Sequence, residues 1–415
     1  MSKTEQIREG YKSSPLGPIP IDWKIIELGE LSEKVGSGIT PAGGEKVYKE
    51  KGRSFIRSQN VGWGTLLMDD IAFIDDNTHN SFRSTEVIIE DVFLNITGAS
   101  IGRSAVADER VVGGNVNQHV CIIRTQKNEL NPFYLNAFLL SKKGQNLIES
   151  YQAGGNRQGL NFEQIRSFKI PIPYLPEQTA IANLLSTWDK AIQTSNALIA
   201  KKELRKKWLM QQLLTGKKRL KGFGGEWKKF HAGEIFRNIS KKGNGKEELL
   251  SATQDKGIIP RTMLETRVTM PSGDTESFKL VEVGDFVISL RSFQGGLEYS
   301  YYRGVVSPAY TVLKPIKKIN DEFYKQYFKS YDFIGHVATA VIGIRDGKQI
   351  SYEDFCFVKI PYPVFEEQTA IATVLLAADK ELQLLKTKAE QLKEQKKGLM
   401  QVLLTGKKRL KIDNI

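Results

Sequence analysis

The sequence predicts an α+β protein in which two mixed α/β domains follow one another as a tandem pseudo-repeat, each leading into a long helix. Three observations predict this class. One motif-rich segment occurs twice at a fixed spacing. Both copies have helical periodicity and defined ends. The stretches before them contain short strand-like runs separated by Gly, Asn and Asp. At 415 residues the chain is long enough for two to four folding units.

The repeat is the strongest signal in the chain. Residues 177–182 (Glu-Gln-Thr-Ala-Ile-Ala) recur at 367–372, and residues 213–221 recur at 403–411. Both pairs share one gapless offset of 190 residues, and 24 of 45 aligned positions are identical. The similarity fades farther upstream, so variable and constant segments alternate. The predicted boundaries are 1–175 and 222–364 for the domains, and 176–221 and 365–415 for the helical regions.

Each constant segment is expected to be a helix of about 38 residues, on the order of 55 Å long. Pro176 suits a first helical turn, and Gly216 and Gly406 suit a left-handed stop. Side chains stepping by four and three form a coiled-coil seam on each helix: Trp188, Ile192, Ser195, Ile199, Lys202, Lys206, Leu209 and Leu213, and Ala378, Leu382, Leu385, Ala389, Leu392, Lys396, Leu399 and Leu403.

Neither helix can bury its seam alone, so pairing of the two is favoured. An antiparallel coiled coil is predicted because it places the two domains at opposite ends, related by an approximate two-fold axis. The alternative is that each helix packs on its own domain.

The variable segments are expected to contain short strands followed by a helix. In the first segment the expected strands are 54–57, 86–89, 92–96 and 119–123, and the helix spans 134–148. In the second they are 286–290 and 309–313, followed by a helix near 321–330.

Composition narrows the class of partner. Sixty Lys and Arg against 47 Asp and Glu give a formal charge of +13, which favours a polyanionic partner. Cys121 and Cys356 each lie in an apolar run and are expected to be buried reduced thiols, which excludes a disulfide framework and a cysteine zinc site. The chain has no membrane-length apolar run and its start lacks a signal-peptide core, so a cytoplasmic location is expected.

The charge is unevenly distributed. Residues 176–221 hold 10 Lys and Arg against 3 Asp and Glu, and residues 366–415 hold 10 against 7, so the helical segments carry +10 of the +13. Localised polar loops therefore fit the domains better than a generally basic face. The clusters at 217–221 and 407–411 could touch DNA backbone or an acidic partner, although cations at a helix C-terminus are also favoured by its dipole.

Apparent catalytic motifs have simpler explanations. Asn131-Pro132-Phe133-Tyr134 resembles the adenine-holding motif of amino-methyltransferases, but it lacks the second proline and a preceding Gly-rich cofactor loop, so a helix cap is preferred. Around Glu276 and Lys279 the spacing does not suit a nuclease strand, and a solvated loop is preferred. The sequence contains no P-loop, and His79, His119, His231 and His336 show no metal-ligand spacing. These features predict a binding protein without metal or cofactor.

The duplicated helix start (Glu-Gln-x-x-Ile), the duplicated helix end (Leu-Met-Gln-x-Leu-Leu-Thr-Gly-Lys-Lys-Arg-Leu) and the two dissimilar domains resemble the DNA specificity subunits of Type I restriction-modification enzymes. The resemblance covers essentially the whole chain. It implies two target-recognition domains, each reading one half of an asymmetric bipartite double-stranded DNA site, and helices that set the spacer. It also implies no catalysis in this chain. Two modification subunits would carry S-adenosylmethionine, and restriction subunits would use ATP and Mg.

Polar and aromatic loop residues are the candidates for DNA contact, because Asn and Gln can pair with adenine and Arg with guanine. In the first domain they are Arg57, Ser58, Gln59, Asn60, Thr97, Ser100, Arg103, Asn115, Asn117, Gln118, Asn156, Arg157 and Gln158. In the second they are Thr253, Gln254, Arg291, Ser292, Phe293, Gln294, Tyr299, Tyr301, Tyr302, Arg303 and Arg345. The alternative for each is a turn residue that bonds its own backbone.

Two other functions are open on the residues alone. One is a helical scaffold whose domains bind RNA or proteins. The other is a single-chain enzyme with fused methylation activity, which the missing cofactor motifs and the chain length disfavour.

Overall fold

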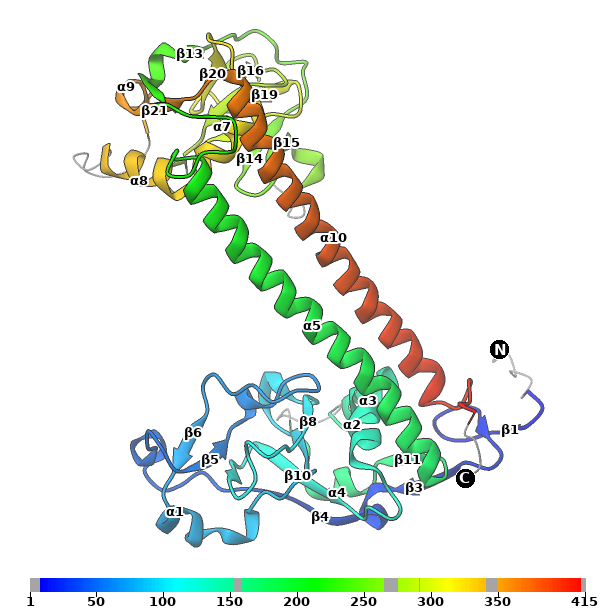
Figure 1. The fold of residues 1–415 in the computed structure, drawn as a ribbon. Coiled ribbons are helices and arrows are strands. Elements are labelled where there is room, and N and C mark those ends of the chain that lie inside the picture. The colour runs from blue at the N-terminus through cyan, green and yellow to red at the C-terminus, as the bar shows by residue number, and fades with distance from the viewer. Residues whose placement is uncertain (1–7, 153–158, 265–274, 291, 341–349, 412–415) are drawn as a thin grey trace. The chain divides into compact units, whose positions relative to one another are not determined.

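The computed structural model describes residues 8–152, 159–264, 275–290, 292–340 and 350–411. The chain divides into two compact units, residues 1–195 with 388–415, and residues 196–387. Each unit therefore contains one variable domain and a stretch of each long helix (Figure 1). The predicted domain boundaries stay predictions. Within the described ranges, no helix is long and apolar enough to cross a bilayer.

The first unit contains mostly short elements before its long helix. They are β1 (Tyr11–Lys12), β2 (Ile19–Pro20), β3 (Lys24–Glu27), β4 (Ser32–Ser37), β5 (Arg53–Ile56), β6 (Ala72–Ile74), α1 (Asp76–Ser81), β7 (Val92–Asn95), β8 (Ser104–Val106), β9 (Asn115–Val116), β10 (Val120–Thr125), α2 (Pro132–Leu140), α3 (Lys142–Ser150), α4 (Phe162–Arg166) and β11 (Lys169–Ile172).

The centre of the first domain is an antiparallel sheet in the order β4-β10-β7-β8. Strand β10 is buried on both faces, because its alternate side chains enter different cores. Cys121 and Ile123 pack with α2 and α3, whereas Val120 and Ile122 pack toward the smaller sheet β6-β5-β9. Burial raises the pKa of the Cys121 thiol to about 12, which makes it the inert buried thiol that was predicted.

The second unit repeats this plan with different sequences. Its elements are β12 (Lys228–His231), β13 (Phe236–Ile239), β14 (Leu250–Thr253), β15 (Gly257–Pro260), β16 (Lys279–Val281), β17 (Phe286–Ile288), α6 (Ser292–Gly295), β18 (Glu298–Tyr299), β19 (Gly304–Val306), β20 (Thr311–Pro315), α7 (Asp321–Phe328), α8 (Tyr331–Ala340), α9 (Tyr352–Phe357) and β21 (Lys359–Tyr362).

The second domain has the same sheet order, β13-β20-β17-β18, and its core is dominated by aromatic side chains. Phe236 contacts the rings of Phe286, Tyr324 and Phe328 at centroid distances of 5.4 to 5.6 Å. The small strand pairs β11-β3 and β21-β12 also correspond, and each joins the start of its domain to the strand before the long helix. The tandem pseudo-repeat predicted from sequence is therefore confirmed as a repeat of fold.

The long helices are α5 (Leu175–Leu213) and α10 (Phe365–Leu403), and they run antiparallel. Every predicted seam position is buried or half-buried. In the second unit, Glu203 pairs with Lys386 and Lys206 pairs with Asp379. Residue numbers therefore increase along α5 in the direction in which they decrease along α10. In the first unit, Asp189 pairs with Lys396 at 2.6 Å. The antiparallel pairing is confirmed in both units.

Both helices end at the same motif by the same geometry. The amides of Lys218 and Lys408 bond back to the carbonyls of Gln212 and Val402, and the intervening Gly216 and Gly406 have φ of +71° and +67°. Glycine is needed at Gly406 for a second reason, because a Cβ there would lie 2.4 Å from the ring of Pro20. The left-handed stops predicted from sequence are confirmed.

Three sequence expectations were wrong. Residues 86–89 are not a strand: Glu86 forms an isolated bridge with Asn115, and the chain turns over residues 88–91, where Asp91 accepts the amide of Ile88 at 2.9 Å and Glu90 adopts φ of +70°. The helix expected over 134–148 is split into α2 and α3, because Ser141 ends one and caps the next through Gly144. Cys356 is free but only half-buried.

Candidate nucleic-acid interface

A buried ion pair joins the start of α5 to the motif that follows α10. Glu177 is 1% exposed, and its carboxylate accepts bonds from Arg409 at 2.5 and 2.7 Å and from the indole of Trp23 at 3.3 Å. Arg409 also pairs with both oxygens of Asp22 at 2.9 Å, and this bond lowers the pKa of Asp22. We call this set, Asp22, Trp23, Glu177 and Arg409, the first joint.

The second unit contains the same arrangement, with the roles of the two repeats exchanged. Glu367 is fully buried and accepts bonds from Arg219 at 2.6 Å and from the indole of Trp227 at 2.9 Å. We call Trp227, Glu367 and Arg219 the second joint. In both units, therefore, the arginine after one repeat's helix neutralises the glutamate at the start of the other repeat's helix.

A second set of bonds fixes the recognition-domain helix to the same helix start. The side chain of Gln178 accepts the amide of Asn131 at 2.9 Å, and Gln368 accepts that of Asn320 at 2.8 Å. Asn131 caps α2 by accepting the amides of Phe133 and Tyr134. The capping interpretation of this motif is confirmed, because Tyr134 is fully buried and donates to the carbonyl of Pro171 at 2.7 Å.

In the first domain, exposed candidates gather at one end of the sheet. The loop after β7 begins at Thr97, whose hydroxyl lies 2.6 Å from Nδ1 of His119. Gln118 is exposed, and its side chain accepts the amide of Thr40 at 3.2 Å. Ser100 and Arg103 lie in the same loop and are half-buried. These contacts bring the segments 97–103 and 117–119 together.

Another candidate segment lies beside this loop, but several of its polar groups already have partners within the domain. The carbonyl of Ser58 accepts the side-chain amide of Asn95 at 2.7 Å. Arg57 pairs with Asp70 at 3.1 Å and covers the ring of Tyr48, and Gln59 also bonds Asp70. A base contact by Arg57 or Gln59 would have to compete with Asp70.

Three asparagine candidates are buried. Asn60 bonds the carbonyls of Leu67 and Asp70 and the amide of Arg57. Asn115 is 0% exposed and bonds His79 and Thr85, and Asn117 accepts the amide of His119. Their polar groups already serve the fold, so they are left out of the contact set proposed below.

In the second domain, the candidates before β18 are held by one lysine. Lys329 donates to the carbonyl of Gly295 at 2.9 Å, to that of Gln254 at 3.3 Å and to the carboxylate of Glu298 at 2.7 Å. The side chains of Gln254 and Gln294 are exposed. Ser292 is buried and accepts the amide of Ser289, and Thr253 bonds its own turn through Gly257. Lys329 is not predictable from the sequence, because its role depends on the fold.

The tyrosine-rich candidates divide into two kinds. Tyr299 and Tyr301 are in ring contact at 4.8 Å, and the ammonium of Lys325 lies 4.7 Å from the Tyr301 ring centre. Burial raises the pKa of Tyr299 to about 12, whereas Tyr301 is 43% exposed. Tyr302 packs against the smaller core, and Arg303 pairs with Glu247 and Glu282.

Five candidates lie outside the described residues: Asn156, Arg157, Gln158, Arg291 and Arg345. Phe293 is placed only as part of α6. A further exposed residue, not predicted from the sequence, is Trp63, which is 60% exposed and forms a β-bridge with Ser104 beside the loop 97–103. The position of this tryptophan between Gly62 and Gly64 could have indicated an exposed turn residue. Of the described residues, no group of three or more His, Cys, Asp and Glu is placed to hold a metal ion.

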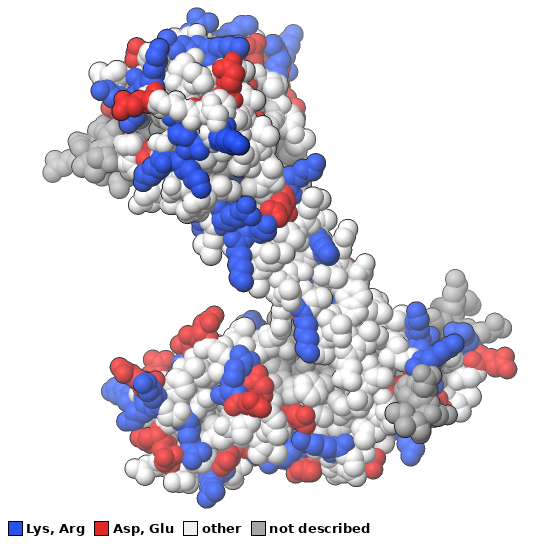
Figure 2. Space-filling view, in the orientation of Figure 1, with Lys and Arg blue, Asp and Glu red and all other residues white. Residues whose placement is uncertain are grey.

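The charge on the first domain is mixed. Figure 2 shows Lys and Arg alternating with Asp and Glu over its visible face. Several cations of this domain are paired, as in Arg110 with Asp108 and Arg124 with Asp91. Localised polar contacts therefore suit this domain better than a continuous basic surface.

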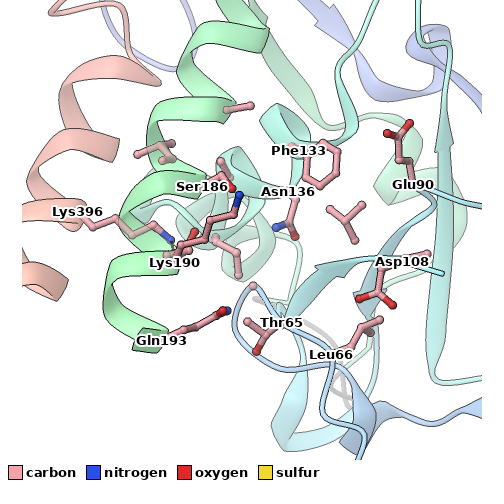
Figure 3. Close-up of a pocket in the computed structure, with 18 of the residues that line it drawn as sticks. Thr65, Leu66, Glu90, Asp108, Phe133, Asn136, Ser186, Lys190, Gln193 and Lys396 are labelled. Atoms are coloured by element: carbon pink, nitrogen blue, oxygen red, sulfur yellow. Dashed lines mark hydrogen bonds and ion pairs between the residues drawn. The ribbon is translucent and has the colours of Figure 1, made fainter. Parts of the chain in front are cut away.

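A groove of about 520 Å³ lies between the first domain and the helices. Its helix wall includes Asp189, Gln193 and Lys396, and its domain wall includes α2 and the segments 64–66 and 106–108 (Figure 3). The second unit has a groove of about 1070 Å³ lined by Asp379, Gln383 and Lys206, which are the equivalent residues of the repeat. We call these the first and second grooves.

Comparison with known proteins places both repeats in one family. The model described as "Type I restriction modification DNA specificity domain" matches residues 20–203 and again 224–394. The Type I restriction enzyme MjaVIII specificity subunit of Methanocaldococcus jannaschii is 24% identical, and a second protein of that organism, described as the MjaX specificity subunit, is 27% identical. Each alignment covers 97% of both chains.

Solved structures agree in fold. The HsdS subunit from Thermoanaerobacter tengcongensis matches with a TM-score of 0.51 at 17% identity, over 94% of this chain and 98% of that one. The Type I restriction-modification S subunit from M. genitalium matches with a TM-score of 0.55 at 16% identity, over 97% and 99%.

Proposed function

The chain belongs to the family of DNA specificity subunits of Type I restriction-modification enzymes, and from this premise we propose that it binds an asymmetric bipartite double-stranded DNA sequence, one half-site per domain. The observation that carries the proposal is the contrast between the two domains. Their sheets and joints are equivalent, whereas the loops at the candidate positions differ in sequence and in conformation. Two domains that share a fold but differ in their loops are suited to bind two different half-sequences.

The proposed contact set is limited to candidates with accessible polar or aromatic groups. In the first domain it comprises Thr97, Ser100, Arg103 and Gln118, with Arg57, Ser58 and Gln59 beside them and Trp63 added from the structure. In the second it comprises Gln254, Gln294, Tyr301 and Arg303. Side-chain amides and guanidinium groups can form the paired bonds that discriminate bases in the major groove.

We further propose that this chain recognises DNA without catalysing a reaction, and that it assembles with two modification subunits and with restriction subunits. S-adenosylmethionine, ATP and Mg would be bound by those partners. The support is the family, together with the missing cofactor and nucleotide motifs in the sequence. If the domains instead bound RNA, RNA would displace duplex DNA from the assembled complex in a gel-shift competition, and if they bound protein, neither nucleic acid would be shifted.

Mapping of methylated sites tests the bipartite model. The complex should methylate one pair of half-sequences separated by a fixed unspecified spacer. Gln118→Ala should relax one half-site and Gln254→Ala the other, each by roughly 1 to 3 kcal/mol of discrimination. Gln391→Ala, an exposed position on α10, is the control and should leave both half-sites unchanged. Equal loss on unrelated DNA would indicate phosphate contacts instead.

The helices are proposed to set the spacer. Seven residues inserted after Asn196, with seven after Thr387 on the opposing helix, keep the seam in register and lengthen the pair by about 10 Å. The half-sites should stay the same while the spacer grows by roughly 2 to 3 base pairs, because a B-DNA turn of about 10 base pairs spans about 34 Å. An unchanged spacer would refute this role of the helices.

A further inference from the structure

One chain of hydrogen bonds links two loops of the first domain that carry proposed DNA contacts. The backbone amide of Thr40 donates to Oε1 of Gln118 at 3.2 Å. The nitrogen of the same carboxamide lies 3.4 Å from Nε2 of His119, and Nδ1 of this ring lies 2.6 Å from the hydroxyl of Thr97. The sequence predicted Gln118 and Thr97 as DNA contacts, but not His119, which joins them.

The direction of each bond follows from one fixed donor. A backbone N–H can only donate, so Gln118 turns its oxygen to Thr40 and its –NH2 group to His119. An amide –NH2 group can only donate, so Nε2 of His119 accepts. A neutral imidazole with an accepting Nε2 carries its proton on Nδ1, which therefore donates to the hydroxyl oxygen of Thr97. These contacts assign one tautomer to His119 and one orientation to the carboxamide of Gln118.

The backbone of His119 is held on both sides. Its amide donates to Oδ1 of the buried Asn117 at 3.1 Å, and its carbonyl accepts the amide of Ile96 at 3.0 Å. The residue directly precedes the buried strand β10. His119 is half-buried, whereas Gln118 is exposed. The ring is therefore a fixed support, and the exposed carboxamide is the part of the chain of bonds that can reach a base.

The carboxamide of Gln118 keeps one donor and one acceptor for DNA. Its –NH2 group has two hydrogens and its oxygen has two lone pairs, and the chain of bonds uses one of each. A donor beside an acceptor is the pair that glutamine presents to N7 and N6 of adenine in the major groove. If the carboxamide turned over, the two atoms would exchange places and this match would be lost.

We propose that His119 is a positioning residue that sets the base preference of Gln118, and that a proton gained by the ring removes this preference. The inference rests on the proposed function and adds how one half-site is read. In the imidazolium both ring nitrogens are donors, so Nε2–H would face the –NH2 group of Gln118 with no acceptor between them. Turning the carboxamide over would only move the same conflict to the amide of Thr40.

The surroundings of the ring supply no acceptor for its charged form. On the described segments 38–41, 96–103 and 117–120, the charged side chain is that of Arg103, a cation that cannot accept a bond from the imidazolium. The proposed contact set of the second domain contains no histidine. Histidine side chains change their charge between about pH 8 and pH 5. Reading of the first half-site should therefore depend on pH in this range, and reading of the second should not.

Binding of the assembled complex to duplexes with one changed base pair tests the proposal at pH 8 and pH 6. Discrimination is the ratio of the Kd for the changed duplex to the Kd for the intact duplex, so general effects of pH on DNA binding cancel. The base pair that Gln118 reads is the one whose discrimination Gln118→Ala removes. At this base pair the wild type should lose roughly tenfold in discrimination at pH 6, the value of one paired contact. Discrimination in the second half-site should stay constant.

Three variants separate positioning from a structural role. His119→Gln offers an oxygen in place of Nε2 and does not titrate, so it should discriminate equally at both pH values. His119→Leu removes the acceptor and should lose the discrimination at both, with thermal unfolding checking that the fold is kept. His336→Gln, at an exposed histidine of the second domain, is the matched control and should keep the wild-type pH profile.

The outcomes distinguish the inference from the proposed function. Discrimination by the wild type that does not change with pH, or a change that persists in His119→Gln, rejects the positioning role. If Gln118→Ala leaves both half-sites unchanged, Gln118 reads no base and the inference is wrong, while the proposed function can stand on the other contacts. A wild-type complex that prefers no duplex sequence rejects the proposed function, and the inference with it.

Discussion

The two joints share a tryptophan, a glutamate and an arginine, but they differ in the sequence separation between the segments that each joint brings together. Arg219 and Trp227 of the second joint are eight residues apart. Arg409 and Asp22 of the first joint are separated by 387 positions. In the joint closed over the long distance Arg409 bonds the additional carboxylate Asp22, whereas in the second joint Arg219 instead donates to the backbone carbonyls of Gly224 and Gly225.

This difference shows how a repeat compensates for its connectivity. Because loop-closure entropy rises with the logarithm of length, closing the longer segment costs on the order of 3 kcal/mol more. The bidentate Asp22–Arg409 pair partly offsets that cost at the end that lacks a short tether. The two copies therefore share the buried glutamate and differ in its surroundings.

The largest expected effect comes from removing the joint arginines. Arg409→Met should lower the free energy of unfolding of the first unit by about 3 to 4 kcal/mol, because Glu177 is left buried with only a long bond from Trp23. Arg219→Met should cost the second unit about 2 to 3 kcal/mol, because Glu367 keeps the closer bond from Trp227.

Hydrogen exchange in denaturant, followed separately for strands β10 and β20, resolves the two units. Lys408→Met and Lys218→Met, the exposed neighbours, serve as matched controls. Equal costs for the two arginines would show that the closer bond from Trp227 does not protect Glu367.

The next largest expected effect distinguishes the second domain from the first. Lys329→Met should lower the stability of the second domain by about 2 to 3 kcal/mol and relax its half-site, because Lys329 ties Gln254 and Gly295 to the buried Glu298. In the first domain Gln145 plays the comparable part through neutral bonds to the carbonyls of Gly102 and Leu139, so Gln145→Leu should cost about 1 kcal/mol. Methylation maps that change at both half-sites in either variant would contradict this.

Glu298→Gln sharpens the same contrast through its pH dependence. Burial raises the pKa of Glu298 above 4.5, so folding disfavours its charge, and the described residues supply no bond to its second oxygen. The penalty is absent below about pH 4.5 and complete above the raised pKa. The variant should therefore gain Tm relative to wild type as pH rises through that window, and a constant difference would argue against it.

The smallest effect belongs to Asp22, which is 60% exposed. Its bond to Arg409 lowers its pKa below 3.8, so it stabilises the first joint above that pH and loses the effect as pH falls through the lowered pKa. Asp22→Asn should cost about 0.5 to 1 kcal/mol near pH 7 and less near pH 2. Denaturant titrations at both pH values measure it, with Glu226→Gln as the control.

The sequence predicted the fold where local signals and the repeat agreed. The helix ends at Gly216 and Gly406 and all sixteen seam positions follow from periodicity and turn chemistry. The turn at 88–91 was missed because the composition of residues 86–89 is that of a strand, and only the position of Asp91 shows that the chain turns there. The split at Ser141 was missed, although the apolar run ends there and serine is a favoured helix cap.

The candidate site was less predictable because exposure depends on long-range pairing. Asn60, Asn115 and Asn117 have the composition of a reading loop, yet each bonds a segment that the fold brings to it or its own turn. Lys329 shows the opposite case: it is important for the fold, but nothing in the sequence of its helix distinguishes it from other lysines. The partner of Glu177 could not be chosen from the sequence either, because Arg219 and Arg409 end identical motifs.

The crossed joints also bear on the order in which the molecule can be made. The core around Trp23 is completed by Leu403 and Leu404, which are translated about 380 residues later. At roughly 5 to 20 residues per second, the earliest domain waits on the order of 20 to 80 seconds for its final contacts. The second domain receives its helix ends in sequence and can close first. The domain that leaves the ribosome first is therefore the last to finish folding, and it depends on protection from aggregation until α10 arrives.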